Sequence, residues 1–554
     1  MSKFDIQSVL AQVEQLLRQA GELPLEAQLA IEKLLNMVET LCADRQELVD
    51  EVKRLREQLD QKKRAKNSSD KTDGSGPSNH SSEQQRKARR KKQPALRDRR
   101  SGKNLVIHEE IECPVDPSTL PPDAVRVEDE IVIVQDIEIK PRNIRFTRQV
   151  FYSINTAQKY RGSLPSGFDQ GDFGANLRAL IVSLKYSGNM SEPKILEFLE
   201  NFDVQVSSGS ISNILTKTAD SFETEFDEIV AAGLASTPYQ QTDDTSARVD
   251  GEFWHTHVLC NPFYAAYFTR PHKDRLTVLE VLQNTHDLRF QFGTEMVSLL
   301  NSEFQLPTKW ETKIAEVGEC ELNRQSLDKL LDNWFDKGNR QLRTAIEQAA
   351  AIIYYRHQTL LPRVGTIVCD DAGQFKLVTD RLSLCWIHAG RHYEKVSPVV
   401  PRHAELLKQF VGRYWDYYQS LHEYRAGPSP LRATTLRAEF DELFSTRTGY
   451  AALDDRIEKT GEKKSELLTV LDEPWLPLHN NASELQARVS ARRRDVSLHS
   501  RSVGGARAMD IFTTIVQTSK LLGISSYVYL RDRISKTFAC PALAQAIQSA
   551  AQPP

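Results

Sequence analysis

Apolar residues in the first sixty positions recur in alternating steps of four and three. Arg45 is the only polar member of the series, which runs through Ile31, Leu34, Val38, Leu41, Leu48, Val52, Leu55 and Leu59. A helix with this spacing carries one continuous apolar stripe, as coiled coils do. We therefore predict coiled-coil dimerisation helices over residues 1–60. An amphipathic helix packed on its own protein is the alternative.

The next segment, residues 61–104, lacks apolar periodicity and is rich in Lys, Arg, Ser and Gly. Such a composition cannot bury enough apolar surface to offset the entropy of ordering, so we expect a disordered basic linker. Its RKARRKK cluster is a candidate phosphate-binding arm, formed by Arg89, Arg90, Lys91 and Lys92.

Alternation of apolar and polar positions predicts a small β-rich unit over residues 105–165, most clearly in DEIVIVQDIEIK and NIRFTRQVFYSI. Helical patterns follow at 174–186, 191–201 and 208–218, the last with Ser208 or Ser210 available as its N-cap. Three short helices with tight connections suit a helix-turn-helix, although any small helical subdomain would look the same. We assign 166–235 as a helical DNA-binding domain.

Strand patterns return after residue 236. PYQQTDD, EFWHTHVLCN and YAAYFTRPH read as three consecutive antiparallel strands, joined by the turn signals VDGE and NPF. Asp243 lies on the first of them. An apolar run from Thr366 leads directly to Asp370, as in a buried strand whose C-terminal end presents a carboxylate. Glu484 lies in a helix-forming stretch after the loop PLHNN.

These patterns predict an α/β fold with an RNase H-like catalytic core over residues 236–500. A helical insertion is expected near 395–470, and a helical tail over 501–554. The length of 554 residues suits three to five structural units. No apolar run approaches the length of a membrane span, and the N-terminus lacks a signal peptide, so a cytoplasmic, nucleoid-associated protein without membrane contact is expected.

Composition changes this picture in two places. The seven cysteines are scattered, odd in number and never in CxxC spacing, which argues against a disulfide framework and a four-cysteine zinc site. The net charge of −3 hides a concentration of positive charge just after Glu484, where DNA phosphates could be bound. The candidate DNA-binding side chains there are Arg488, Arg492, Arg493 and Arg494.

Three acids in three separate settings, Asp243, Asp370 and Glu484, form a candidate metal site if the fold brings them together. Two Mg²⁺ ions about 3.5–4 Å apart can activate a water or a 3′-hydroxyl and stabilise the leaving oxygen. Mg²⁺ prefers hard oxygen ligands and retains waters, so a few carboxylates suffice without His or Cys. Taken alone, however, an acid at a strand end or on a helix is usually a solvated surface residue.

The C-terminal half resembles the transposases of the insertion sequence 66 family, within the DDE superfamily. QTDDTS is similar to that family's Asp-Glu-Thr motif, with Asp243 in the catalytic place and Asp244 replacing the Glu. Asp370 and Phe375 match a second Asp followed by an aromatic residue. A third motif of the family is matched by Cys385-Trp386-Ile387-His388-Ala389-Gly390-Arg391. A fourth is matched by the segment PLHNNASEL, through Pro477, Leu478, Asn480, Asn481 and Glu484. The match spans most of residues 236–535, including the closing KLLGISSYVYLRDRI.

The resemblance also shows departures. The interval of 127 residues from Asp243 to Asp370 is wider than the family usually shows, which implies an inserted helical subdomain near 295–360. His479 stands where the family has Asp, and Leu485 where it has Arg, so this is a divergent sequence. The family's N-terminal zinc-binding unit has no cysteine pairs here, because Cys113 is the only cysteine between 100 and 165, and we predict no zinc. Neighbouring side chains on a strand point to opposite faces, so one acid of each Asp pair should bind metal. The alignment favours Asp243 and Asp370.

Other residues near these acids are expected to support the site. They are Asp244, Asp371, His388 and Asn481, and a core-packing role for His388 is an equal alternative. The resemblance implies a metal-dependent DNA transposase with Asp243, Asp370 and Glu484 as catalytic ligands of two Mg²⁺ ions, for which Mn²⁺ can substitute. Its partners would be element-end DNA, target DNA and further copies of the chain in a homodimer or higher oligomer. The alternatives are a nuclease without strand transfer and a catalytically inactive DNA-binding regulator.

Overall fold

The computed structural model describes residues 24–64, 106–116, 119–121, 124–125, 128–168, 171–335 and 339–552. The chain divides into two units. One comprises residues 1–59, 145–201 and 205–554, and the other comprises residues 60–144 and 202–204. Most of the predicted basic linker, including Arg89, Arg90, Lys91 and Lys92, lies outside the described residues.

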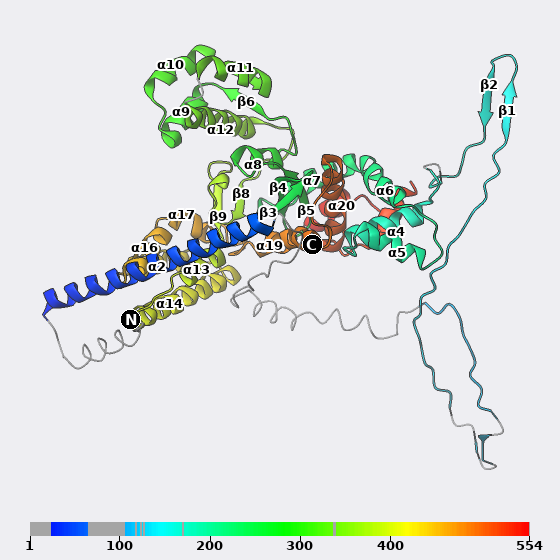
Figure 1. The fold of residues 1–554 in the computed structure, drawn as a ribbon, viewed down its shortest axis with the longest axis horizontal. Coiled ribbons are helices and arrows are strands. Elements are labelled where there is room, and N and C mark those ends of the chain that lie inside the picture. Colours follow the sequence, from blue (N-terminus) through cyan, green and yellow to red (C-terminus); the bar gives the residue numbers. More distant parts are fainter. Residues whose placement is uncertain are drawn as a thin grey trace. The chain divides into compact units, whose positions relative to one another are not determined.

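A five-stranded mixed sheet forms the centre of the larger unit (Figure 1). Strands β3 (Tyr239–Val249), β4 (Glu252–Cys260) and β5 (Ala265–Arg270) are antiparallel neighbours, as the sequence predicted. Strands β8 (Thr366–Cys369) and β9 (Arg381–Leu384) continue the sheet in parallel beyond β3. The order is therefore β5-β4-β3-β8-β9, and the predicted α/β class is confirmed.

The outer edge of the sheet is closed by a helix rather than by another strand. Helix α20 (Val503–Leu521) lies along β5, and its polar side chains at one-turn intervals accept hydrogen bonds from alternate backbone amides of that strand. Thr518 pairs with the amide of Ala265, Thr514 with Tyr267, and Asp510 with Thr269, at 3.3, 3.1 and 2.7 Å between donor and acceptor atoms. Four helical residues rise about 6.0 Å, close to the roughly 6.8 Å covered by two strand residues, which allows this pairing. The predicted C-terminal tail thus belongs to the core.

In the described chain, four helices lie between the hairpin region and the first strand of the sheet. The three predicted from sequence are present as α4 (Ala175–Tyr186), α5 (Glu192–Glu200) and α6 (Ser208–Asp220), and α7 (Glu223–Ser236) follows. The N-cap of α6 is Ser207, whose Oγ accepts from the amide of Ser210, so the predicted caps, Ser208 or Ser210, were one or three residues late. Helix α20 packs against α4, α6 and α7, which joins these helices to the sheet.

The β-rich unit predicted at 105–165 is largely absent from the described residues. Only a hairpin forms, from β1 (Val150–Ser153) and β2 (Gln158–Arg161), and residues 128–149 contain no strand. The alternating segment around Ile131 to Val134 is extended but exposed, with Ile131 85% accessible. Alternation predicted a pleated chain there, but a strand also requires a neighbouring strand and a surface to cover its apolar face.

The insertion between β5 and β8 is a compact helical subdomain with its own small sheet. Strands β6 (Arg289–Phe292) and β7 (Cys320–Asn323) pair antiparallel. They are surrounded by α8 (Arg275–Leu282), α9 (Thr294–Phe304), α10 (Thr308–Val317), α11 (Arg324–Trp334) and α12 (Arg340–His357). The insertion predicted near 295–360 is therefore helical, although its two strands were not predicted.

A second helical region follows β9. It consists of α13 (Trp386–Glu394), α14 (Pro401–Ala426), α15 (Pro430–Phe444), α16 (Ala451–Gly461), α17 (Lys464–Leu467) and α18 (Thr469–Asp472). Trp386 is fully buried at its centre, with ring contacts to Tyr414, Tyr417 and Phe440. Helix α19 (Asn481–Ser497) then returns the chain to the sheet, where it packs on β3 and β4.

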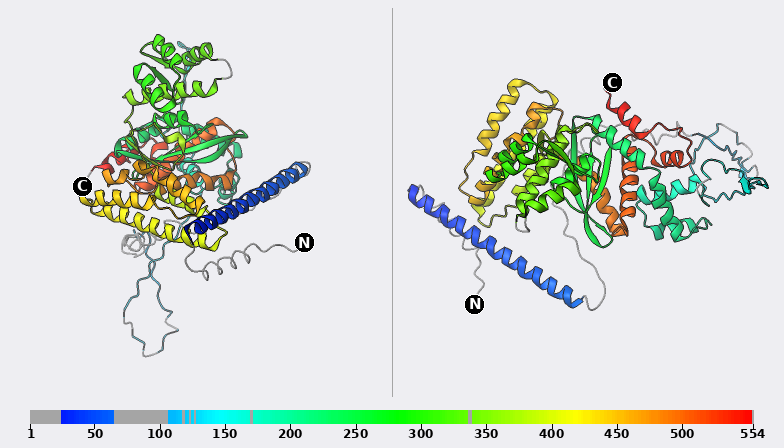
Figure 2. Two further views of the ribbon diagram at one scale, coloured as in Figure 1. Left: turned by 90° about the vertical axis from the view of Figure 1, so that its left-hand side faces the viewer. Right: turned by 90° about the horizontal axis from the view of Figure 1, so that it is seen from above.

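The long helix α2 (Leu25–Arg64) contacts this second helical region through its first half (Figures 1 and 2). Leu35 is buried against Val400, and Glu39 accepts hydrogen bonds from the amides of Val399 and Val400 at the start of α14. Glu39 also contacts His403 at 3.1 Å. Beyond this anchor, Leu41, Leu48, Val52 and Leu55 are exposed. Helix α2 thus docks on its own protein and still presents an apolar stripe.

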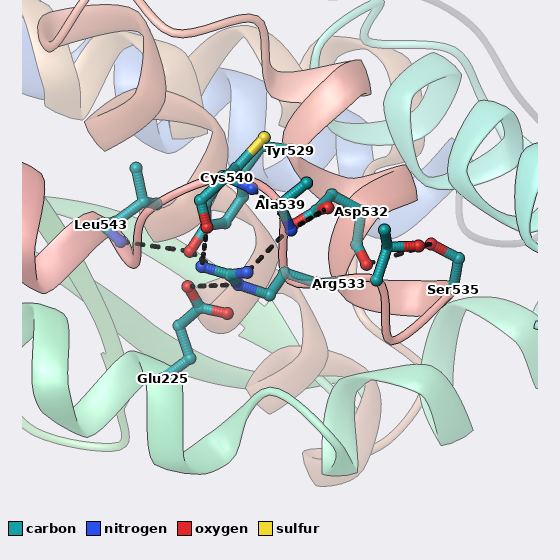
Figure 3. A network of polar contacts seen from close by, with 9 residues as sticks. Glu225, Tyr529, Asp532, Arg533, Ser535, Ala539, Cys540 and Leu543 are labelled. Atoms are coloured by element: carbon teal, nitrogen blue, oxygen red, sulfur yellow. Dashed lines mark hydrogen bonds and ion pairs between the residues drawn. The ribbon is translucent and has the colours of Figure 1, made fainter. Parts of the chain in front are cut away.

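The C-terminus is fastened to α7 by a polar network around Arg533 of α21 (Ser526–Ile534), shown in Figure 3. Arg533 lies 3.5 Å from Glu225 and 2.9 Å from Asp532, and its Nη2 donates to the carbonyl of Cys540. Asp532 accepts from the amides of Ala539 and Cys540. The loop before α22 (Leu543–Ala551) is therefore held without a disulfide among the described cysteines.

Candidate active site

Asp243 and Asp370 lie beside each other because of the strand register. Strands β3 and β8 run parallel, with Gln241 opposite Val368 as the last matched pair. Asp243 and Asp370 each lie two residues beyond that pair, on the same side of the chain as its members. The parallel pairing therefore carries both carboxylates to one point at the end of the ladder.

Helix α19 brings Glu484 to the same face of the sheet. Residues directly opposite each other in β3 and β4 share a face, and Asp243 is opposite Val258. Val258 packs against Ala487 of α19. Glu484 lies three residues before Ala487, which places it on the same face of the helix, one turn earlier. Glu484 therefore points toward the sheet face that carries Asp243.

The loop before α19 is attached to both β3 and α13. The side-chain amide of Asn480, which is buried, donates to the carbonyl of Thr242 at 2.6 Å. Its backbone amide donates to the Sγ of Cys385 at 3.2 Å. Asn480 thus fixes the start of the glutamate helix next to the strand that bears Asp243. Asn481 is the half-buried first residue of α19.

The three carboxylates influence one another electrostatically. The pKa of Asp243 is raised to about 7, mainly by burial and also by the neighbouring charges of Asp244, Asp370 and Glu484, while a hydrogen bond from the Asp244 amide opposes the shift. Like charges in a poorly solvated site disfavour simultaneous ionisation. A divalent cation would remove that repulsion.

Two arginines and a histidine surround Glu484, whose side chain is 13% exposed. Its Oε1 lies 3.5 Å from Arg391 Nη1 and 3.6 Å from His388 Nε2, and its Oε2 lies 3.8 Å from Arg488 Nη2. Burial lowers the pKa of His388. Within the described residues no hydrogen bond is made to Glu484 Oε1, so this buried oxygen has a free acceptor position. Arg391 was not predicted, although it belongs to the quoted Cys-Trp-x-His-x-x-Arg motif.

The second acid of each pair is engaged elsewhere. Asp244 lies 3.4 Å from Lys273 Nζ and accepts a hydrogen bond from Gln374 Nε2 at 3.3 Å. Asp371 forms an ion pair with Lys463. These contacts are compatible with the expectation that Asp243 and Asp370, rather than their neighbours, face the cluster with Glu484.

The arginines of α19 differ from the surface group expected from sequence. Arg488 and Arg492 are exposed, and Arg494 is half-buried and donates to Ser246 Oγ. Arg493 is only 4% exposed, lies over the ring of Tyr186 and donates to Thr513 Oγ1 and to the Tyr186 carbonyl. Arg493 therefore packs in the interior of the protein and does not offer the DNA contact that was expected. Helical periodicity explains this, since Arg493 continues the buried line of Ser483, Ala487 and Ser490.

The donor set fits Mg²⁺. Three carboxylates, one with a raised pKa and one with an unused buried oxygen, supply the hard oxygen ligands that this ion prefers. Among the described residues, the ligand atoms of a softer set, Cys385, His388 and Glu484, lie within 4.8 Å of one another, whereas those of Asp243, Asp370 and Glu484 do not all meet within that distance. The carboxylate cluster and this softer set therefore share one residue.

Comparison with known proteins gives a family match for part of the chain, and Asp243 lies outside the matched residues. The family description "Transposase IS66 family" matches residues 330–508, which contain Asp370, His388 and Glu484. An uncharacterized protein, y4jO, of Sinorhizobium fredii (strain NBRC 101917 / NGR234) is 32% identical over 308 residues, or 55% of this chain and 94% of that protein.

The chain belongs to the IS66 family of transposases.

Membership of the IS66 family indicates a nucleic-acid-processing enzyme with DNA as its partner. The Cys-Trp-x-His-x-x-Arg segment forms α13, and the Asn-Asn-x-x-Glu segment starts α19, so both IS66 motifs meet at Glu484. Among the described helices, none combines the length and apolar character of a bilayer-spanning segment.

Proposed function

We propose that this protein is a DNA transposase that cuts the ends of an insertion sequence and joins them to target DNA, with Asp243, Asp370 and Glu484 as its catalytic carboxylates. One observation carries the proposal. The β3–β8 register and the α19 packing bring these acids within electrostatic reach, so that Asp370 and Glu484 both raise the pKa of Asp243.

The sheet supports an RNase H-like core. Three antiparallel strands are followed, after a helical insertion, by two strands parallel to the first, and the first strand bears the leading acid. An acid on the first strand, a second at the end of the adjoining parallel strand and a third on a flanking helix is the arrangement that the family resemblance implies. The helical insertion separates Asp243 from Asp370 in sequence but leaves β3 and β8 hydrogen-bonded.

In the proposed mechanism, Asp243, Asp370 and Glu484 would hold two Mg²⁺ ions, or Mn²⁺ in their place. When bound, the ions supply an activated water or 3′-hydroxyl and stabilise the leaving oxygen. The chain itself orients these ligands: Asn480 fixes the start of α19 on β3, and Arg391 and His388 constrain Glu484. Arg488 and Arg492, exposed on the same helix, would contact DNA phosphates.

We further propose that two copies act together through α2. Its exposed residues Leu41, Leu48, Val52 and Leu55 have the four-three spacing of a coiled-coil seam. Two joined protomers would hold two element ends at once, as end joining requires.

The deciding experiment supplies the purified protein with duplexes carrying the DNA that borders its gene, together with Mg²⁺ and a supercoiled target plasmid. Cleaved ends and joined products are expected from the wild type, and neither from Asp243→Asn, Asp370→Asn or Glu484→Gln. Pre-cleaved ends test joining alone. Cleavage without joining would support a nuclease, and wild-type DNA binding with equally inactive wild type and variants would support a regulator.

A further inference from the structure

A pocket next to the carboxylate cluster gathers positive charge that the proposed chemistry does not use. Its ionisable lining residues are Asp371, His388, His392, Arg456, Lys459 and Lys463. The two histidines come from α13, the three cations come from α16 and the turn after it, and Asp371 comes from the loop after β8. Three full cations and two imidazoles therefore face a single carboxylate. None of the three cations was singled out by sequence reasoning.

The pocket shares a wall with the site. His388 lines it and also lies 3.6 Å from Glu484, while Asp371 lines it and follows Asp370 directly in the chain. A group bound in the pocket would thus be separated from the catalytic carboxylates by one side chain. On a DNA strand that crosses the site, such a group would be a phosphate next to, or close to, the one that reacts.

The cations of the pocket are only partly neutralised. Lys459 pairs with Asp455 at 2.8 Å, but both side chains are more than half exposed, so this surface pair contributes little. No ion pair is found for Arg456 in the part of the chain that the structure describes. His392 is half-buried, and its pKa is lowered by burial and by the positive charges of Arg456, Lys395 and His388. The pocket is thus short of negative charge.

The only acid of the pocket occupies the place that an anion would take. Asp371 pairs with Lys463, and both side chains are about 30% exposed. A phosphate entering the pocket can exchange with this carboxylate at Lys463 and pair bidentately with Arg456.

We propose that this pocket binds a backbone phosphate of the DNA strand beside the reacting phosphodiester, with Arg456 and Lys463 as its main contacts. The proposal rests on the proposed function for the identity of the strand. Asp371 then serves as an internal counter-ion that keeps Lys463 in position before DNA arrives.

Salt-dependent DNA binding tests the subsite without catalysis. The full-length wild type and Arg456→Gln and Lys463→Gln variants would be titrated with a fluorescent 30-bp duplex of fixed sequence in EDTA, at several KCl concentrations. Each phosphate contact contributes about 0.9 to the slope of log K against log salt concentration. We expect each pocket variant to lose close to that amount and to bind several-fold more weakly at moderate salt.

The chain offers matched controls. Lys464 follows Lys463 directly but pairs with Asp441, and Arg437 pairs with Asp472, and neither lines the pocket. Lys464→Gln and Arg437→Gln remove the same charge and should leave the slope unchanged. Asp371→Asn should bind the duplex more tightly, because it releases Lys463. Circular dichroism would establish that each variant is folded.

Slopes equal to wild type in both pocket variants would overturn the proposal, as would equal losses in the pocket and control variants. Competition distinguishes a strand-bound group from a free anion. Unlabelled duplex and inorganic phosphate would each be used to displace the fluorescent duplex from the pocket variants. Weaker displacement by the duplex with unchanged displacement by phosphate is expected for a strand-bound group, and the opposite result would overturn the proposal. EDTA prevents chemistry, so a loss of binding at the subsite can be interpreted even if the protein proves unable to join DNA. Normal cleavage by both pocket variants, with the wild-type salt dependence, would reject the subsite and leave the proposed function intact.

Discussion

Asp510 accepts two hydrogen bonds from one residue of the edge strand, Thr269. Its Oδ2 lies 2.7 Å from the Thr269 amide and its Oδ1 lies 2.7 Å from the Thr269 hydroxyl. Asp510 is almost fully buried, and burial raises its pKa to about 6. With Thr514 and Thr518 it replaces the missing neighbour strand, since an unpaired edge would leave these amides without acceptors.

The first prediction concerns this helix-to-strand pairing. Asp510→Ala should lower the free energy of unfolding by about 2–3 kcal/mol, because it leaves a buried amide without a partner. Asp510→Asn retains one acceptor oxygen and should cost less. Urea denaturation at pH 7 measures both. Equal stabilities of Asp510→Ala and the wild type would mean that the pairing does not stabilise β5.

The second prediction follows from the raised pKa of Asp243, about 7 against an ordinary value of 3.8. Between these values the native state binds a proton that the unfolded state has lost, so stability contributed by this residue falls as the pH rises. In EDTA, Asp243→Asn should therefore be more stable than the wild type above pH 7, by about 1–3 kcal/mol. The difference should shrink toward zero as the pH approaches 4.

Urea denaturation of both proteins across that pH range would show the trend. A stability difference that does not change with pH would show that the pKa of Asp243 is ordinary and that its neighbours do not raise it.

The third prediction concerns metal binding. If the carboxylates hold Mg²⁺, 10 mM of the ion at a Kd near 1 mM would stabilise the folded protein by about 1.4 kcal/mol. Asp243 must lose its proton first, so the increase in Tm should be larger at pH 8 than at pH 6. Calorimetry of the wild type and of Asp370→Asn supplies the comparison. An equal increase in the variant would place the ion elsewhere.

The fourth prediction separates the two roles of α2. Leu48→Glu combined with Leu55→Glu should convert an oligomer into monomers, because both side chains lie on the exposed stripe. Glu39→Ala should leave the oligomer intact and lower stability by about 1–3 kcal/mol, because two amides at the start of α14 lose their acceptor. Light scattering after size exclusion reports the mass. A wild-type mass for the double variant would refute the seam.

The fifth prediction uses two adjacent arginines as a matched pair. Arg492→Ala, on the surface, should weaken DNA binding and leave the Tm unchanged, since only a phosphate contact is removed. Arg493→Ala should lower the Tm by several degrees, because its contacts with Tyr186 and Thr513 lie in the interior. The opposite assignment of effects would reverse our reading of this helix.

Much of the sheet could be predicted because its signals are local. Turn residues between alternating segments identified β3, β4 and β5, and an apolar run ending in Asp370 identified β8. The pairing of β3 with β8 could not be read from local patterns, because a long insertion separates them. Only the resemblance to a family connected Asp243 with Asp370 before the register was known.

The errors arose where tertiary contacts decide. The alternation around Ile131 had no neighbour to pair with, so it predicted strands that are absent from the described chain. Arg493 looks like its neighbours in sequence, and its burial depends on which face of α19 meets α20 and α4. The pairing of Asp510 with the edge strand β5 could not be predicted for the same reason. Three spaced polar residues on a helix do not indicate which strand they contact.

The contact between Glu39 and the start of α14 has a consequence during synthesis. The two ends of this contact are separated by 360 residues. At 5–20 residues per second, a ribosome needs about 20–70 s to make the second after the first. For that interval the apolar side of the nascent N-terminal helix lacks its own docking surface. Pairing between the N-terminal helices of two chains growing on one messenger would cover this apolar side during that interval. Such pairing favours dimers of chains translated together over dimers of chains that meet after synthesis.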